Sequence, residues 1–160
     1  MPSDWELLAR IGLGFLLAFI VGFEREVRGS PAGDRTFALI GGSAAAVTAV
    51  LYRTSPQALA GIITGIGFIG AGVVFHGENT FVRGITTASA IFAIAGTGVV
   101  AGTGHLLLAT ATALGVLLIL ELRNIPGARL LDARRYTESF RDDNDPPPTL
   151  RSKRSPRRDV

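Results

Sequence analysis

Apolar residues are gathered into long blocks, and polar stretches separate these blocks along the first 122 residues. A helix needs about 20 apolar residues, within a range of about 17–25, to cross the hydrocarbon core of a bilayer. The pattern therefore predicts an all-α polytopic membrane protein with about five transmembrane helices. The blocks run over residues 7–23, 37–51, 58–75, 85–101 and 106–122.

The block at residues 37–51 is the weakest of these, because it is short and rich in alanine and glycine. One interpretation of it is a re-entrant segment. A full span is preferred, since the blocks on either side would otherwise be joined by a very long apolar loop. The first block is expected to be retained, because Asp4 and Glu6 precede it where a signal peptide has a basic region.

Basic residues are unevenly shared between the two sides that five spans would create. Three arginines lie in the loop after the first block, Arg83 lies just before the fourth, and ten basic residues follow at residues 123–160. Arg10 and Arg53 lie on the opposite side. Because loops rich in lysine and arginine stay in the cytoplasm, the pattern predicts the N-terminus outside and the C-terminus in the cytoplasm.

The positive net charge comes from the tail of the chain. Residues 1–122 hold six basic and seven acidic side chains, whereas residues 123–160 hold ten and six. We expect a transmembrane domain at residues 1–125 and a short, basic, proline-rich and largely disordered cytoplasmic tail at residues 126–160, with a short amphipathic helix near its start. The charge of the tail favours contact with anionic lipids and is no sign of nucleic-acid binding.

The nucleophilic and metal-binding residues exclude several chemistries. The chain has no cysteine and only two histidines, His76 and His105, both at block edges. A thiolate metal site and a cysteine nucleophile are therefore excluded, and a histidine zinc site is disfavoured. No nucleophile–base pair is recognisable, so we expect neither an enzyme nor a bound cofactor.

Small residues recur four positions apart in several blocks, a spacing typical of closely packed transmembrane helices. Packing within the chain is the preferred interpretation, and a homodimer face or a pore-lining strip is the alternative. The glycine run at residues 65–72 predicts a helix that bends or crosses a partner very tightly. The recurring residues are Gly14, Ala18 and Gly22, Gly61 and Gly65, Gly67 and Ala71, and Gly98 and Gly102.

A charged cluster at residues 24–28 follows the first block directly. Glu24 and Arg28 are four residues apart and pair if the helix continues. Arg35 and Arg83 share this side in the predicted topology, so we expect them to pair with the two glutamates of the cluster. Three interpretations remain open: positive anchoring with solvated acids, an ionic lock between loops, or a mouth for cation entry.

Carboxylates are the side chains that would serve a cation here, since Mg²⁺ prefers one or two of them plus waters. Glu24, Glu26 and Asp34 are weak candidate ligands, because neighbouring arginines compete for them. No ionisable residue falls in the middle of a block, although ion pathways usually contain such residues. A pore built of backbone carbonyls stays open as an alternative.

Hydroxyl side chains open the fourth block, at Thr86, Thr87 and Ser89. We expect them to bond to backbone carbonyls or across to another helix. The alternative is that they line a polar vestibule.

Three stretches of the chain resemble the signatures of the MgtC/SapB family of bacterial inner-membrane proteins, in the family's order and spacing. Residues 22–36 are similar to the signature after the first span, and residues 65–72 and 82–89 are similar to the second and third. The resemblance covers residues 7–122. It implies that the family-determining positions are Glu24, Arg25, Arg35, Thr36, Gly65, Gly67, Gly70, Gly72, Arg83, Gly84, Thr86 and Thr87.

The chain departs from the family pattern at three places. Phe37 stands where many members have histidine, and Phe92 stands where many have tryptophan. Some members carry a folded cytoplasmic domain of ACT type, and this polar tail is too short to be one. The regulatory properties of that domain are therefore not expected here.

The resemblance implies a multi-pass protein of the bacterial inner (plasma) membrane, linked to magnesium limitation and homeostasis, acid tolerance or survival inside host cells. One hypothesis is a non-enzymatic regulator that acts by helix–helix contact within the bilayer. Its partner would be a second copy, or a membrane complex such as the F-type ATP synthase. The other hypothesis is a small transporter or channel for Mg²⁺ or another cation.

Overall fold

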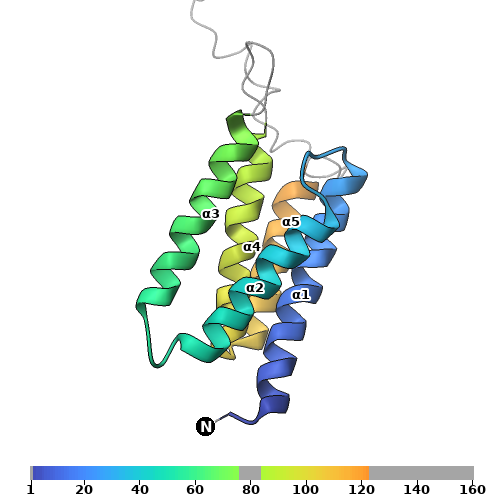
Figure 1. The fold of residues 1–160 in the computed structure, drawn as a ribbon. Helices are drawn as coiled ribbons and strands as arrows, with labels where there is room; N and C mark the ends of the chain where they lie inside the picture. Colours follow the sequence, from blue (N-terminus) through green and yellow to red (C-terminus); the bar gives the residue numbers. More distant parts are fainter. Residues whose placement is uncertain (1, 76–83, 123–160) are drawn as a thin grey trace, which may run out of the picture. The chain divides into compact units, whose positions relative to one another are not determined.

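The structure is a computed structural model that describes residues 2–75 and 84–122. These residues form helices, and no strand occurs among them. Figure 1 shows that successive helices run in opposite directions, so all of their ends lie at one or the other end of the bundle. The helices are α1 (Asp4–Val27), α2 (Asp34–Leu51), α3 (Gln57–Phe75), α4 (Ile85–Thr103) and α5 (Leu106–Glu121).

The predicted all-α fold is confirmed, because within the described residues one helix coincides with each of the five apolar blocks. Of these, α1, α3 and α4 are long and apolar enough to cross a membrane, and α5 is a shorter apolar helix. The weakest block forms α2, a continuous helix of 18 residues that runs antiparallel to α1. The predicted tail lies outside the described residues.

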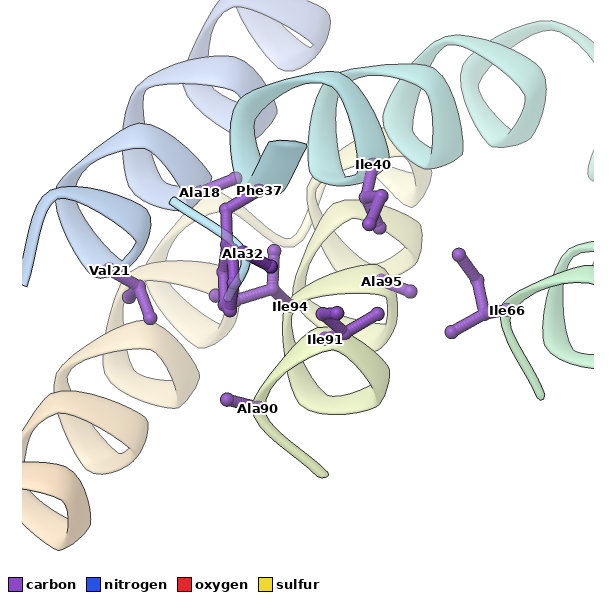
Figure 2. Packing of buried hydrophobic residues seen from close by; sticks show 10 residues of the cluster. All are labelled: Ala18, Val21, Ala32, Phe37, Ile40, Ile66, Ala90, Ile91, Ile94 and Ala95. Carbon is purple, nitrogen blue, oxygen red and sulfur yellow. The ribbon is translucent and has the colours of Figure 1, made fainter. Parts of the chain in front are cut away.

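The centre of the bundle lies where α1, α2 and α4 meet. Figure 2 shows Phe37 of α2 reaching between the other two helices, in one cluster with Val21 of α1 and Ile94 of α4. All three side chains are fully buried. Ile66 of α3 reaches the same cluster from the other side of α4.

Glycines set the distance between these three helices. A Cβ atom added to Gly14 of α1 would lie 2.6 Å from the Ala45 Cβ atom of α2. A Cβ atom on Gly102 of α4 would lie 2.5 Å from the Ala45 carbonyl oxygen, and one on Gly98 would overlap the carbonyl of Gly41. The preferred interpretation of Gly14 and of the Gly98–Gly102 pair, packing within the chain, is therefore confirmed.

Helix α3 packs far less closely than its neighbours. Among its residues whose burial is described, only Ile66 and Gly70 are buried. A Cβ atom added at Gly61, Gly65 or Gly67 would meet no atom of another segment within 4 Å. The tight crossing predicted from the glycine run is therefore not made within the described residues, because these glycines face open space and not the backbone of α2 or α4.

Two apolar grooves flank α3. The groove between α2 and α3 has a volume of about 370 Å³, and Leu39, Ser43 and Gly65 lie among the residues that line it. The groove between α3 and α4 has a volume of about 470 Å³, and Gly67 and Phe92 lie in its lining. Both grooves exist because the glycines of α3 carry no side chains to fill them.

Candidate functional site

The residues singled out from the sequence gather mainly at one end of the bundle, where α1 and α5 end and α2 and α4 begin (Figure 1). We call this the charged end. It consists of the α1–α2 loop together with Glu24, Arg25, Glu26, Arg28, Asp34, Arg35, Thr87 and Glu121.

Glu24 is held between two arginines of its own segment. Its carboxylate accepts hydrogen bonds from both Nε and Nη2 of Arg25, and both side chains are only 12% exposed. Arg28 Nε lies 3.2 Å from Glu24 Oε1, which confirms the predicted pair at a spacing of four residues. Both carboxylate oxygens of Glu24 are thus bonded to arginines of the same segment.

Arg28 also connects α1 to the last helix. Its Nη2 atom donates to both carboxylate oxygens of Glu121 in α5, at 2.6 and 2.7 Å. The hydrogen bond with Glu121 raises the pKa of the Arg28 guanidinium above its ordinary value, and the charge of Glu24 adds to this rise. Sequence reasoning missed Glu121. The signal that could have found it is an acidic residue at the very end of an apolar block on the basic side.

Glu26 has a structural role at the start of α2. Its Oε2 atom accepts a hydrogen bond from the backbone N–H of Asp34 at 3.0 Å. The residue before the helix, Gly33, has no side chain to provide such a cap. A Cβ atom on Gly33 would overlap the Glu26 carboxylate, so the glycine is what lets that carboxylate approach the end of the helix.

The predicted network of loop arginines and glutamates is only partly formed. Among the described residues, no carboxylate of Glu24 or Glu26 lies within 4.0 Å of Arg35, and Arg35 and Thr36 are exposed. Arg83 lies outside the described residues. The prediction for Arg35 is wrong because Arg25 and Arg28, on the same helix as Glu24, reach its carboxylate first.

The three candidate metal ligands are engaged in other bonds. Glu24 pairs with arginines, and Glu26 and Asp34 accept from backbone N–H groups of α2. In the part of the chain that the structure describes, no group of three histidine, cysteine or acidic side chains is placed to hold a metal ion. At this end the three carboxylates are therefore bonded to arginines and to the start of α2.

Hydroxyl groups connect the α1–α2 loop to α4. Ser30 Oγ lies 2.9 Å from Thr87 Oγ1, and Thr87 is buried. Ser89 donates to the carbonyl of Ile85 at 2.9 Å, as predicted, and both Ser89 and Thr86 are exposed. Gly84, with φ of +88°, precedes α4 in a conformation that favours glycine.

Comparison with known proteins assigns this arrangement to a family. The model of the MgtC family matches residues 11–126 of the chain, which include all five helices apart from the first turns of α1. The chain belongs to the MgtC family. It is thus a membrane protein of MgtC type, and the resemblance seen in the sequence is confirmed.

Three relatives illustrate how the chain fits the MgtC family. It is 33% identical over 135 residues to an uncharacterised protein of Haemophilus influenzae, covering 76% of this chain and 57% of the relative. Protein SapB of Bacillus subtilis is 34% identical over 131 residues, 74% of this chain and 56% of SapB. Protein MgtC of Salmonella typhimurium is 41% identical over 108 residues, 65% of this chain and 45% of MgtC. The chain thus spans about half the length of these relatives, and no solved structure matches it.

The MgtC-family signatures occupy two different places in the bundle. The first and third meet at the charged end, where the Ser30–Thr87 hydrogen bond joins them. The second lies on α3, where a Cβ atom added to Gly70 would lie 3.7 Å from the Ala88 Cβ atom of α4, and one added to Gly65 or Gly67 would meet nothing within 4 Å. A Cβ atom on Gly72 would also meet no described atom within 4 Å. The signatures therefore mark a lock between segments at one end and an open helix face along one side.

Replacing Glu26 by alanine is expected to destabilise this member of the MgtC family by about 1 kcal/mol, because the first turn of α2 loses its cap. Glu26→Gln keeps an oxygen acceptor for the Asp34 N–H and should lose less than half as much. Chemical unfolding in detergent measures both variants. Equal losses in the two would show that the charge of Glu26, not its hydrogen bond, stabilises the end of α2.

Proposed function

We propose that this protein is a non-enzymatic, multi-pass regulator of the bacterial inner membrane that acts through contact between α3 and a helix of another membrane protein or of a second copy. Membership of the MgtC family, which is not a known enzyme family, supports this proposal. The setting we propose for it is magnesium limitation and homeostasis, acid tolerance or survival inside host cells. We also propose that the N-terminus lies outside and the C-terminus in the cytoplasm, which would put the charged end in the cytoplasm. Topology reporters fused to each terminus test this orientation. Two cytoplasmic termini would overturn it.

The open glycine face of α3 is the observation that carries the proposal. Lipid offers little hydrophobic drive for helices to associate, so close backbone approach at small residues takes its place. The glycines of α1, α2 and α4 already serve this purpose inside the bundle. Gly61 and Gly65 of α3, one helical turn apart, leave backbone uncovered on a helix that has few buried residues.

Leucine at Gly61 and Gly65 is expected to weaken association with a partner helix by at least about tenfold, or about 1.4 kcal/mol. The added side chains would hold the partner's backbone away from α3. Folding should be unchanged, since a Cβ atom at either position meets no other segment. A two-hybrid assay in bacterial membranes, or energy transfer between labelled chains in lipid bilayers, measures the association.

Gly12→Leu is the matched control, because Gly12 is an exposed glycine of α1 that also meets nothing within 4 Å. It should leave association at the level of the parent chain. Proteins copurified from native membranes with the parent chain, and absent from the variant with two leucines, would be the regulated partners. Unchanged association and an unchanged set of copurified proteins would contradict the proposal.

The rival hypothesis of Mg²⁺ transport is tested separately with the purified chain in liposomes that contain a Mg²⁺-sensitive dye. A regulator that acts by contact gives no protein-dependent flux under a gradient or a membrane potential. Flux that depends on the protein, and that persists in the variant with leucine at Gly61 and Gly65, would favour the transporter.

A further inference from the structure

Two arginines and a tyrosine converge at the end of the bundle opposite the charged end. Arg10 lies on α1, and Tyr52 and Arg53 follow α2 directly. Arg53 Nε donates to the Tyr52 hydroxyl at 2.7 Å, and its guanidinium also lies over the Tyr52 ring, 5.4 Å from the centroid. The Arg53 hydrogen bond is the main cause that lowers the pKa of the Tyr52 phenol, and Arg10 contributes to the same effect.

Arg10 is half-buried and extends toward the end of α4. Its Nη1 atom lies 3.5 Å from the Gly102 carbonyl, which is long for a hydrogen bond. Its guanidinium rests against Gly104, where an added Cβ atom would lie 2.8 Å from the Arg10 Cζ atom. The φ angle of +94° at Gly104 favours glycine as well. The absence of a side chain at Gly104 thus leaves room for the Arg10 guanidinium. A single long contact with a carbonyl uses only part of the hydrogen-bond donors of Arg10.

Neither arginine has a carboxylate partner in the described part of the chain, where every ion pair lies at the charged end. Glu6 stands one helical turn before Arg10 and would be its natural partner. Its carboxylate instead accepts the backbone N–H of Ser3 at 3.0 Å, in the capping box that begins α1. Arg53 thus donates to the phenol hydroxyl, Arg10 lies near enough to act on the same phenol, and neither guanidinium is paired with a described carboxylate.

We infer that Arg10, Tyr52 and Arg53 form a binding site for the phosphate group of an anionic phospholipid. Guanidinium groups bind phosphate oxygens through paired, charge-assisted hydrogen bonds, and the Tyr52 hydroxyl is a further polar contact. The surroundings favour a lipid over free phosphate. Trp5, on the same end of α1, is 81% exposed, and tryptophan and tyrosine are enriched where a bilayer meets water, at the level of the headgroups.

Trp5 makes the site measurable, because it is the only tryptophan of the chain. The full chain is reconstituted in nanodiscs, and a spin-labelled lipid is then titrated into them. In one series this lipid is phosphatidylglycerol with the label near its headgroup, and in the other it is phosphatidylethanolamine with the same label. Quenching of Trp5 fluorescence then compares the two lipids at this end of the bundle. The parent chain is expected to prefer phosphatidylglycerol by at least about tenfold, as one or two charge-assisted hydrogen bonds would give.

Arg10→Gln with Arg53→Gln should reduce this preference at least about fivefold, since both guanidinium groups are lost. Arg35→Gln is the matched control, because it removes the same charge from an exposed arginine at the charged end. Arg53→Gln alone, at an exposed residue after α2, guards against misfolding caused by loss of Arg10. It should give an intermediate preference in a chain that melts like the parent.

Three results would overturn the inference. One is an equal preference in the parent chain and in the variant without Arg10 and Arg53. The second is an equal loss with Arg35→Gln, which would show general attraction between charges instead of a site. The third is relief of the quenching by millimolar inorganic phosphate, which would assign the pocket to free phosphate and not to a lipid.

Discussion

Replacing Gly102 by leucine is expected to abolish the folded bundle or to destabilise it by more than about 3 kcal/mol. Overpacking a core usually costs about 1–3 kcal/mol because neighbouring side chains can move aside. Here the neighbours are backbone: a Cβ atom at Gly102 would lie 2.5 Å from the Ala45 carbonyl oxygen and 3.0 Å from the Ala49 nitrogen. Helix α2 would have to move away from α4 along its length, and its buried contacts with α1 would be strained too.

Thermal unfolding in detergent, followed by Trp5 fluorescence and by the yield of monodisperse protein, measures this loss. Gly98→Leu should behave in the same way, since its Cβ atom would overlap the carbonyl of Gly41. Gly12→Leu and Gly65→Leu introduce the same side chain where nothing lies within 4 Å and should melt close to the parent chain. If Gly102→Leu melted like these controls, α2 and α4 could not pack as described.

The glycines also show where sequence reasoning reaches its limit in this fold. A spacing of four residues establishes that Gly98 and Gly102 share one face of a helix. It does not establish whether that face meets the same chain or another. Gly61 and Gly65 have the same spacing, yet an added Cβ atom would meet α2 at the first pair and nothing within 4 Å at the second. Only the arrangement of the helices separates the two cases.

At the charged end, too, the sequence predicts contacts between neighbouring residues but not contacts between distant ones. The pair of Glu24 and Arg28 could be predicted because it depends only on helical periodicity. The second partner of Arg28 is Glu121, which lies 93 residues away in the chain. This contact can be recognised only once α5 is placed beside α1. Arg35 was expected to join the network and does not, since Glu24 is already paired with closer arginines and Glu26 caps the start of α2. Charge and sidedness thus predict which residues share an end, whereas the pairing itself requires the fold.

This division bears on function as well. The first and third family signatures are tied together by Ser30 and Thr87, next to the Arg28–Glu121 pair. These contacts fix the relative positions of α1, α4 and α5, while α3 keeps an open face. A regulator that works by helix contact needs both parts: a rigid frame, and one element free to receive a partner. A variant that loosens the frame should therefore weaken the proposed function even where α3 is untouched.

Phe37→Ala is the sharpest test of that frame, and we expect it to cost about 2–4 kcal/mol. Phe37 is the largest fully buried side chain among the described residues, and it fills the space between α1, α2 and α4 (Figure 2). Truncating a buried phenylalanine costs about 3–5 kcal/mol in soluble proteins, part of it from transfer out of water. Within a bilayer that part shrinks, whereas the lost packing contacts remain.

Phe68→Ala is the control for this variant, because Phe68 is 83% exposed on α3 and is not part of the buried cluster. It should change the unfolding free energy by less than about 0.5 kcal/mol. In the sequence, Phe37 was noted only as a departure from the family pattern. Its burial could not be predicted, because hydrophobic periodicity does not distinguish a residue that faces α1 from one that faces lipid. Equal stability of the two variants in urea or thermal unfolding would mean that the centre of the bundle lies elsewhere. A selective loss in Phe37→Ala, accompanied by weaker association through an unaltered α3, would connect the packed centre to the regulatory face.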